Sequence, residues 1–465
     1  MLTTLLRDSR ALAVLAVPLV LTQLAQVALT TTDTVMMGML GTQELAAGGL
    51  AIVIFNQLRT MGVGLVTSVG NQIAAAAARA EKEKEDTGGE AHDEVRGIVR
   101  ASVAVATLAG VAGGVLMILI GQALTWFGQD AAVVERTRPM LLALAPGLLP
   151  CLWFQVVRQF TVGMRRPQAL LQITIASVAV NAGLNWVLIH GTWGLPRLGL
   201  TGIGVATSSV YLLSFLALYL SAKKDSELAP LLTLNPAKAD PATVRRLVGL
   251  GVPIAATYGS EAGFFSLTAL MAGSFGPAAL AAHTAVNQLV YIVFQVAVGL
   301  SHAASINVSR ELALGRTDGA RRIRNTALAC AAAVMTVVGI TYLTLPRLVL
   351  APFLDSGSAQ ALAIATQLLV VTAFLQFFDC AQNIGVGLLR GLDDTGSGFR
   401  ITLIGYWAVG LPASWLLAYP LGLDTLGIWL GLLTGLATTA VLLLRRYSDS
   451  LAVRTDSRQA TASPA

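Results

Sequence analysis

The sequence predicts an all-α polytopic membrane protein with twelve transmembrane helices in two six-helix bundles. Three observations carry this prediction: the composition, a series of long apolar runs and an internal repeat. Of the 465 residues, 55% are hydrophobic and 12% are charged, and the mean hydropathy is +0.70. Because soluble globular chains carry about 25% charged residues, this composition favours a chain that lies largely in a bilayer.

Twelve apolar runs have the length of about twenty residues that a helix needs to cross a bilayer. They lie roughly at 11–37, 46–72, 97–120, 131–155, 167–190, 200–221, 245–272, 279–306, 321–344, 359–388, 399–420 and 424–445. The first run is too long for the apolar core of a signal peptide and has no clear cleavage site. We therefore interpret it as the first transmembrane helix.

Basic residues gather in alternate loops, on one side of the predicted spans. They are Arg7, Arg10, Arg79, Lys82, Lys84, Arg165, Arg166, Lys223, Lys224, Arg245, Arg246, Arg321, Arg322, Arg324, Arg390, Arg400, Arg445 and Arg446. Because Lys and Arg are enriched in cytoplasmic loops, we expect this side, and with it both termini, to face the cytoplasm. The same distribution explains the isoelectric point near 9.4 without a nucleic-acid partner.

A stretch rich in proline and charge, from Lys223 to Arg246, divides the chain almost in half. We therefore predict an amino-terminal lobe over residues 1–222, a cytoplasmic linker over 223–244 and a carboxy-terminal lobe over 245–446. The polar tail, 447–465, contains no apolar run and is predicted to be disordered.

The two halves are related by an internal repeat. A shift of 235 residues aligns identical residues of the halves, among them Val17 and Val252, Pro18 and Pro253, Gly38 and Gly273, and Gly64 and Gly299. A shift of 225 residues aligns Arg165 with Arg390 and Gly202 with Gly427. Since each copy holds an even number of spans, both copies have the same orientation in the membrane. Parallel repeats of this kind are an architecture of secondary transporters.

Three carboxylates lie well inside predicted spans: Asp33 in the first, Glu261 in the seventh and Asp379 in the tenth. A carboxylate that faces lipid is costly, so each must face the protein interior or a wet cavity, and each is a functional candidate. The alternative is that hydroxyls, amides or an arginine satisfy these acids for structural reasons alone. At the 235-residue shift Asp33 aligns with Thr268 and Glu261 with Gln26, so the lobes share a scaffold but not their charges.

Asp33 has candidate partners on the fifth and sixth spans. Asn181 and Asn185 lie one helical turn apart, so their amides point from one face of a helix, and Thr207 follows on the next span. Such a polar network could hold the ionised acid and release it on protonation. The alternative is that the asparagines make ordinary contacts between helices.

Further polar side chains lie at depth on two other spans. Arg59, in the second span, either pairs with an acid in a cavity or snorkels to the interface. The eighth span carries His283, Asn287, Gln288 and Tyr291. A single histidine in such a place is more often packed and hydrogen-bonded than a proton relay.

These polar residues, with Met36 and Phe265, are the candidates for lining a substrate cavity. The flexible thioether of Met36 and the ring of Phe265 beside Glu261 suit an adaptable apolar wall. Met and Phe in membrane helices usually face lipid or neighbouring helices, which is the alternative here.

No cofactor and no transition-metal site is expected. Cys151, Cys330 and Cys380 lie singly in separate apolar segments, and the four histidines form no cluster with other ligands. The sequence has no GxxxxGK(S/T) phosphate loop, no HExxH motif and no nucleophile with a base at a recognisable spacing. An enzyme is therefore disfavoured, and transport would draw its energy from an ion gradient. A channel stays open as an alternative, which saturable counterflow would distinguish from a carrier.

Four groups of residues carry a family resemblance. They are Asp33-Thr34-Val35-Met36-Met37-Gly38 after Pro18, Glu261, the stretch Leu389-Arg390-Gly391-Leu392-Asp393-Asp394-Thr395, and Asn181 and Asn185 with Gly191, Gly194, Pro196, Gly199 and Gly202. In combination they resemble the multidrug and toxic compound extrusion (MATE) transporters, NorM branch, over about residues 10–445.

The resemblance implies a V-shaped pair of six-helix bundles that exports amphipathic, often cationic drugs in exchange for H⁺ or Na⁺. It further implies a monomer, multi-pass in the lipid bilayer of a bacterial inner membrane. Asp33 would match the acid of the amino lobe, and Glu261 and Asp379 the cation site of the carboxy lobe, where Na⁺ is one candidate ion. This chain departs from relatives with a sodium site at Leu375, where they have a tyrosine, and at Thr284, where the family usually has glutamine.

The mechanism implied is competition between drug and cation for the acids, with the lobes rocking about the linker. The alternative within transporters is a flippase for lipid-linked saccharides, which resembles the same superfamily. A flippase should have a large basic cavity for pyrophosphate, whereas this chain places three acids and one arginine at depth.

Overall fold

The computed structural model describes residues 2–83, 90–128, 130–354 and 358–462, and within these ranges the chain forms helices and turns with no strand. Each of the twelve predicted spans is helical. The second span is formed by two helices that meet at Ser68, and the eleventh by three consecutive helical segments. The prediction of an all-α polytopic membrane protein is confirmed.

The helices in chain order are α1 (Leu2–Leu40), α2 (Thr42–Thr67), α3 (Val69–Glu83), α4 (Glu90–Ala123), α5 (Ala131–Gly163), α6 (Gln168–His190), α7 (Leu200–Lys224), α8 (Pro241–Gly273), α9 (Pro277–Ala313), α10 (Thr317–Thr344), α11 (Pro346–Leu350), α12 (Ala359–Gly391), α13 (Thr395–Leu403), α14 (Leu411–Ala418) and α15 (Asp424–Ala462). Short 3₁₀ segments are η1 (Leu124–Phe127), η2 (Thr192–Gly194) and η3 (Pro236–Lys238), and η4 (Ile404–Gly410) is a π-helix between α13 and α14.

Among the described residues, eleven helical stretches are long and apolar enough to cross a membrane. Helix α8 takes the place of the seventh predicted span but is not one of these eleven. Thr257, Tyr258, Ser260 and Glu261 lower the hydropathy at its centre, whereas the flanking residues 247–256 and 262–273 are largely apolar. The helix that departs most from a plain apolar span therefore carries one of the three candidate acids.

Packing between helices divides the chain into two compact units. Unit 1 comprises Met1–Val20 and Thr257–Ala465, and unit 2 comprises Leu21–Ala256. Relative to the predicted lobes, the first twenty residues join the carboxy-terminal half, and residues 223–256 join the amino-terminal half. The reason is that α1 and α8 are each continuous across a unit boundary.

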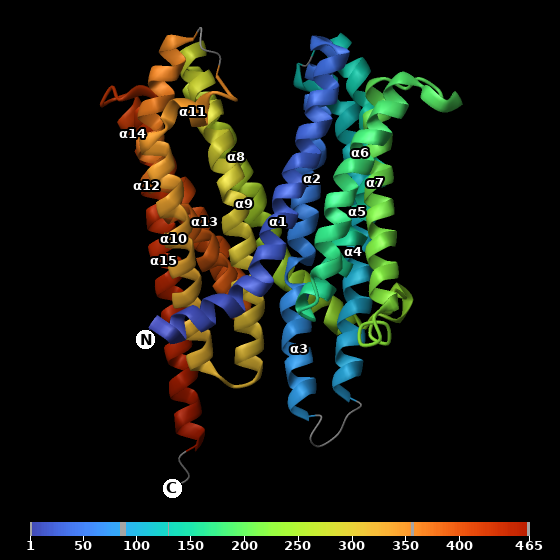
Figure 1. Cartoon of the computed structure of the whole chain (residues 1–465), viewed down its shortest axis with the longest axis vertical. Helices are drawn as coiled ribbons and strands as arrows, with labels where there is room; N and C mark the ends of the chain where they lie inside the picture. The colour runs from blue at the N-terminus through green and yellow to red at the C-terminus, as the bar shows by residue number, and fades with distance from the viewer. Residues whose placement is uncertain (1, 84–89, 129, 355–357, 463–465) are drawn as a thin grey trace. The chain divides into compact units, whose positions relative to one another are not determined.

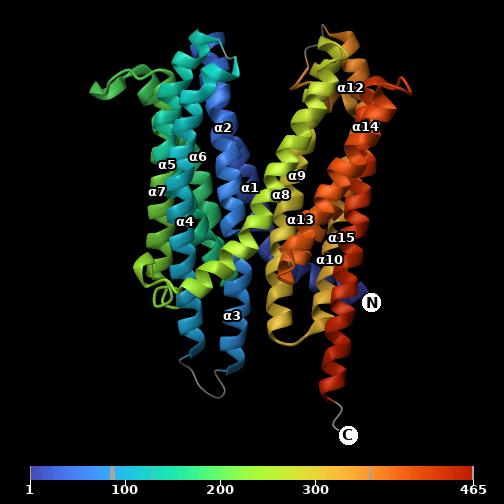
Figure 2. The same cartoon turned by 180° about the vertical axis from the view of Figure 1, so that it is seen from behind.

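Each unit is a bundle with its own apolar core. In unit 2, α5 packs against α2, α4 and α7, and its core includes the buried side chains of Met37, Phe55 and Met140. In unit 1, α12 packs against α9, α10 and α15, and its core includes Phe264 and Trp429. Figures 1 and 2 show these neighbours lying side by side from opposite directions.

The repeat is visible in one close contact that each unit makes. In unit 2 a Cβ atom on Gly64 of α2 would lie 2.7 Å from the Cα of Ala255 on α8. In unit 1 a Cβ atom on Gly299 of α9 would lie 2.9 Å from the Cα of Val20 on α1. These glycines align at the 235-residue shift, and so do their neighbours. Glycine allows the two backbones to approach closely, and the duplicated scaffold keeps this approach in both copies.

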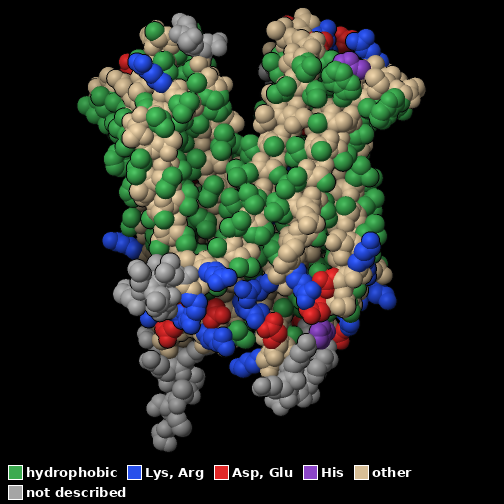
Figure 3. Space-filling model, in the orientation of Figure 1, with side chains coloured by type: hydrophobic (Ala, Val, Ile, Leu, Met, Phe, Trp, Pro, Cys, Tyr) green, Lys and Arg blue, Asp and Glu red, His purple; other side chains and the backbone are tan. Residues whose placement is uncertain are grey.

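The surface of each unit fits a membrane-spanning bundle. In both units Figure 3 shows a broad band of hydrophobic side chains along the helices, with Lys and Arg gathered toward one end. In unit 1 this is the end where α9 turns into α10, and in unit 2 it is the end that holds α3. Apolar flanks with basic residues at one end are typical of multi-pass membrane proteins.

The prediction of a disordered tail over 447–465 is wrong as far as Ala462, because α15 continues to that residue. Tyr447 and Leu451 are fully buried, and the Tyr447 hydroxyl donates to the carbonyl oxygen of Ala320 at 3.0 Å. The Arg454 guanidinium donates to the carbonyl oxygen of Leu392 at 3.0 Å. The sequence expectation missed these contacts because it weighed the polarity of the segment and not the apolar residues spaced along it.

Arg446 at the start of this extension also pairs with the turn before α13. Its Nε donates to Oδ2 of Asp394 at 2.9 Å, while Oδ1 of Asp394 accepts from the backbone N–H of Ser397 and caps α13. Partial burial of Asp394 opposes its charge, but the bonds from Ser397 and Arg446 outweigh this effect and lower the pKa of the carboxyl.

We expect Gly431→Ala to destabilise unit 1. A Cβ atom at this position of α15 would lie 2.2 Å from the backbone nitrogen of Ser414 on α14 and 2.3 Å from its Cα, so one backbone must move. The expected cost is about 1–3 kcal/mol, measured as a lower thermal unfolding midpoint in detergent. The matched control is Gly396→Ala in α13, where a Cβ atom meets nothing within 4 Å. Equal midpoints for the two variants would contradict the close approach of α14 and α15.

Candidate functional site

The first cluster of buried polar groups surrounds Asp33 in unit 2. Asp33 lies on α1 with 3% of its surface exposed. The Nδ2 of Asn185 on α6 donates to Oδ1 of Asp33 at 2.7 Å, and the Oγ1 of Thr207 on α7 donates to Oδ2 at 3.0 Å. The same Nδ2 of Asn185 donates to Oδ1 of Asn181 at 3.1 Å. The structure thus brings together all four residues that the sequence placed in one network.

This arrangement is matched to a charged carboxylate. Each oxygen of Asp33 accepts one hydrogen bond, and hydrogen bonds to a charged group stabilise it by about 1.5–3 kcal/mol each. If Asp33 takes up a proton, the oxygen that carries it becomes a donor, to which the Thr207 hydroxyl can turn as an acceptor but the Asn185 N–H group cannot. Protonation therefore changes how α1 is tied to α6 or α7.

The Asp33 cluster keeps capacity for a further polar group. Among the described residues, Nδ2 of Asn181 and Oδ1 of Asn185 are buried without a hydrogen-bond partner. A buried polar atom without a partner is costly, and a donor and an acceptor on amides one helical turn apart are groups that water molecules can satisfy. Water beside the acid is what a proton needs to enter and leave.

The second cluster lies in unit 1 and contains Glu261 on α8 and Asp379 on α12. Oε1 of Glu261 accepts from Nε2 of Gln382 and from the hydroxyl of Tyr406, both at 3.2 Å. Oδ1 of Asp379, which is 6% exposed, accepts from Nδ2 of Asn383 at 3.3 Å. Glu261 and Asp379 thus each accept from an amide of α12, and these amides belong to neighbouring residues.

The two acids are also joined through side chains of α12. Nδ2 of Asn383 donates to the backbone carbonyl oxygen of Asp379 at 2.9 Å and lies 3.3 Å from both Oδ1 of Asp379 and Oε1 of Gln382, so hydrogen-bond contacts connect Glu261 through Gln382 and Asn383 to Asp379. Polar groups linked in this way polarise one another and respond together. A change of charge on one acid is felt by the other.

Three members of the second cluster were missed by sequence reasoning. Gln382 and Asn383 follow Asp379 by three and four residues, a spacing that puts them on the same helix face, so a search for amides beside the acid would have found them. Tyr406 gave no such signal, because it lies on a different helix and resembles any aromatic residue of an apolar span.

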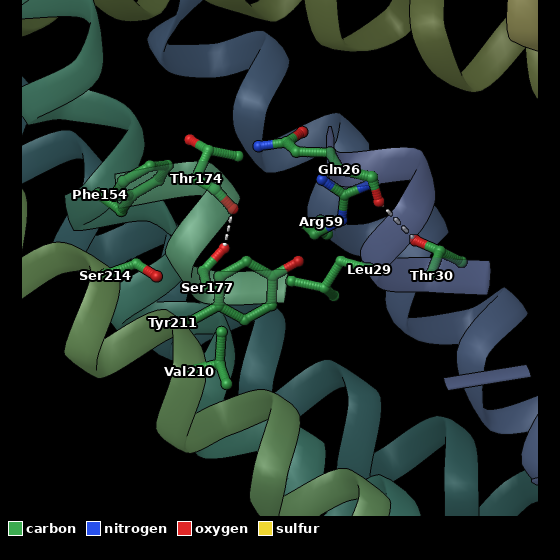
Figure 4. Close-up of a pocket in the computed structure, with 10 residues that line it drawn as sticks. All are labelled: Gln26, Leu29, Thr30, Arg59, Phe154, Thr174, Ser177, Val210, Tyr211 and Ser214. Carbon is green, nitrogen blue, oxygen red and sulfur yellow. Dashed lines mark hydrogen bonds between the residues drawn. The ribbon is translucent and has the colours of Figure 1, made fainter. Parts of the chain in front are cut away.

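Arg59 lines a small pocket inside unit 2, shown in Figure 4. Its Nε donates to Oδ1 of Asn56 at 3.3 Å. The pocket has a volume of about 30 Å³ and is lined by Gln26, Leu29, Thr30, Arg59, Phe154, Thr174, Ser177, Val210, Tyr211 and Ser214. A space of this size has room for about two water molecules. Six of the ten lining residues carry a hydroxyl or an amide, so the guanidinium faces polar groups from several helices.

The other predicted cavity residues are spread over both units. In unit 2, Met36 is partly buried against the core around Met37. In unit 1, Phe265 is partly buried and meets the ring of Phe264 edge to face, with 5.7 Å between the ring centroids. Tyr291 is 46% exposed on α9.

The remaining residues of the α9 row have different surroundings. His283 is 2% exposed in the core of unit 1, where its Nδ1 accepts from Nε1 of Trp429 at 3.1 Å, as a packed histidine would. Asn287 is half-buried. Gln288 lines an open pocket of unit 1 with Thr284, Phe353 and Leu354.

A comparison with known protein families shows to which family the chain belongs. A family model described as MatE matches residues 18–187 and 253–416, which together make up most of the chain. The matched segments begin at Pro18 and Pro253, the prolines that the internal repeat aligns. The chain belongs to the MatE family. Members of this family are transporters, so this MatE protein is a transporter and not an enzyme.

Named relatives agree with this assignment. A probable multidrug resistance protein NorM of Pseudomonas aeruginosa is 35% identical over 440 residues, which cover 93% of this chain and 88% of the relative. Its counterpart in Bradyrhizobium diazoefficiens is 36% identical over 447 residues, covering 93% and 91%. An outward-facing structure of a multidrug resistance MATE family transporter matches the MatE fold of this chain with a TM-score of 0.84, at 16% identity and 96% coverage of both chains.

Proposed function

We propose that this MatE transporter is an antiporter that exports amphipathic, often cationic organic compounds in exchange for a cation. The observation that carries the proposal is that each unit holds its own acid cluster, with Asp33 buried in one and with Asp379 buried and Glu261 half-buried in the other, and that neutral hydrogen-bond donors contact each acid. Relatives named as multidrug resistance proteins support the substrate class.

Coupling follows from the fact that a carboxylate can neutralise one partner at a time. A proton or Na⁺ on Asp33, Glu261 or Asp379 removes the charge that attracts a cationic substrate, and a bound substrate disfavours cation entry. A ligand shifts a conformational equilibrium by its difference in affinity for the two states. Competition at the acids supplies such a difference and links export of one partner to import of the other.

Of the two candidate ions, we propose H⁺. The groups nearest the acids present N–H and O–H donors to them, namely Asn185, Thr207, Gln382, Tyr406 and Asn383. These donors stabilise an ionised carboxylate, and small rotations of their side chains make room for a proton on it. Na⁺, in contrast, needs several oxygen atoms turned toward it. Leu375 further lacks an oxygen where, by the family resemblance, relatives with a sodium site have tyrosine.

We also propose the placement that the sequence predicted: a multi-pass protein of the bacterial inner membrane, with both termini in the cytoplasm, acting as a monomer. The gathering of Lys and Arg at one end of each bundle supports the orientation.

The test is transport by purified protein in proteoliposomes, with ethidium as an amphipathic organic cation. We expect a pH gradient alone to drive ethidium from its own compartment into a more acidic compartment on the other side of the membrane. A Na⁺ gradient at equal pH should leave ethidium movement near background. Ethidium movement driven by Na⁺ alone would contradict proton coupling. Movement that neither gradient changes, or movement of a lipid-linked saccharide in its place, would contradict the antiport proposal.

A further inference from the structure

A π-helix interrupts the eleventh predicted span beside the second acid cluster. Segment η4, Ile404–Gly410, lies between α13 and α14. π-Helices are rare, and single turns of them are frequently found at functional sites. Three glycines seat this segment on α15: a Cβ atom on Gly435 would lie 2.8 Å from the Cα of Gly410 and 2.9 Å from the carbonyl oxygen of Gly405. The backbone of η4 is therefore packed closely against α15.

On its other side, η4 presents two consecutive side chains to two consecutive residues of α8. The hydroxyl of Tyr406 donates to Oε1 of Glu261 at 3.2 Å, and Nε1 of Trp407 donates to Oγ of Ser260 at 2.7 Å. The wider turn of a π-helix changes which side chains share a face, and here neighbours in sequence both reach α8. The hydrogen bond from the Trp407 indole to Ser260 fixes the position of η4 along α8.

The ring of Tyr406 is fixed as firmly as its hydroxyl. It is 1% exposed and stacks on Phe264 with 4.8 Å between ring centroids and 13° between ring planes. Phe264 lies one turn after Glu261 on α8, so the helix that carries the acid also clamps the ring. The phenol cannot swing away from the acid without breaking this packing.

The hydrogen bonds leave the two oxygens of Glu261 in different situations. Among the described residues, both bonds to Glu261, from Gln382 and Tyr406, end on Oε1. Two donors stabilise negative charge on that oxygen. A proton added to Oε2 would therefore leave both of these hydrogen bonds in place.

The phenol comes from a helix where sequence comparison would not look for it. By the family resemblance, the tyrosine of relatives with a sodium site lies four residues before Asp379, and here that position is Leu375, which is 2% exposed in the apolar core of unit 1. Helix α12 thus offers no hydroxyl at that turn, and η4 brings one to the other acid.

We propose that Tyr406 is a positioning residue for proton exchange: held by the π-helix, it fixes the Glu261 carboxylate and sets the pH at which this acid is loaded. This inference rests on the proposed proton-coupled antiport. It adds a residue and a backbone feature to the coupling site.

The test is Tyr406→Phe, which removes the hydroxyl and keeps the stacked ring. Loss of one hydrogen bond to a charged group corresponds to roughly one pH unit. Because the lost donor stabilised the ionised acid, we expect the pH midpoint of ethidium counter-transport to move upward by about that amount. The matched control is Tyr342→Phe in the same unit, which removes a buried hydroxyl bonded to Gln376 and should leave the midpoint unchanged.

A second readout does not depend on transport. Infrared difference spectra recorded across the same pH range should contain a protonated-carboxyl band that Glu261→Gln removes, and we expect Tyr406→Phe to shift the titration of that band upward. If Tyr406→Phe is poorly folded, incorporation of 3-fluorotyrosine at position 406, a stronger donor, should shift it downward. A Glu261 band that titrates identically with Tyr, Phe and 3-fluorotyrosine overturns the role of Tyr406. A shifted band in a protein without pH-driven transport would contradict the antiport proposal alone.

Discussion

Replacing Asp33 with asparagine is expected to reduce proton-driven ethidium transport to background, a loss of at least roughly tenfold. The variant keeps the size of the side chain and can still accept from Asn185 or Thr207, so the bundle around it should remain folded. What it loses is the only titrating group of its cluster. The expected result is therefore an uncoupled protein and not an unfolded one.

The measurement for Asp33→Asn has two parts. Initial rates in proteoliposomes report coupling, and ethidium binding in detergent at several pH values reports competition. We expect binding to survive with a weaker pH dependence than in the wild type. The matched control is Asp130→Asn, the same chemical change at the exposed cap of α5, where Asp130 accepts from the backbone N–H of Ala132. Transport by Asp33→Asn at the wild-type rate would remove this acid from the mechanism.

The second large effect is expected at the pair of acids in unit 1. Glu261→Gln and Asp379→Asn should each lower proton-driven transport by at least roughly tenfold, and the double variant should be no worse than the more severe single variant. The physical reason is that hydrogen-bond contacts connect Glu261 through Gln382 and Asn383 to Asp379, which makes the acids act as one unit. Residues that act as a coupled pair show strongly non-additive effects when both are replaced.

Initial rates for the two single variants and the double variant form a complete cycle. The matched control is Glu311→Gln, which neutralises a carboxylate near the end of α9 that lies 4.0 Å from Arg316. We expect its rate to equal that of the wild type. Losses that multiply in the double variant would show that Glu261 and Asp379 work independently.

Much of the scaffold could be predicted because membrane-spanning helices are recognisable in a sequence from their length and their apolar content. The 235-residue repeat could be predicted because identical residues recur at matching positions, and one of them, Gly64, lies where two backbones come close and a side chain would not fit. The Asp33 cluster could be predicted for a related reason: Asn181 and Asn185 are polar residues one turn apart in an apolar helix, and few partners at that depth can satisfy them.

The missing parts have equally specific causes. Tyr406 could not be identified, because its role depends on η4, and the sequence Ile404–Gly410 reads as an ordinary apolar helix. His283 was a candidate cavity residue because it lies in a row of polar residues on α9. Its hydrogen bond with Trp429, which comes from a distant helix, cannot be seen in the sequence. Contacts made by side chains from distant helices leave no pattern in either helix alone.

The crossing of α1 and α8 between units sets the order in which the protein can be assembled. Unit 2 is one uninterrupted stretch, Leu21–Ala256, and can close as soon as it has been synthesised. Unit 1 cannot, because Met1–Val20 must wait for Thr257 and the residues beyond it. At about 5–20 residues per second, that wait lasts roughly 10–50 s.

The segment Met1–Val20 is thus made before unit 2 but finds its partners only after unit 2 is complete. Asp8 pairs with Arg322, and Val20 packs against Gly299, only after α9 and α10 exist. During the interval the amino-terminal segment has to be kept from other partners by the membrane or by the insertion machinery. A duplicated gene whose first helices stayed within their own halves would have no such delay.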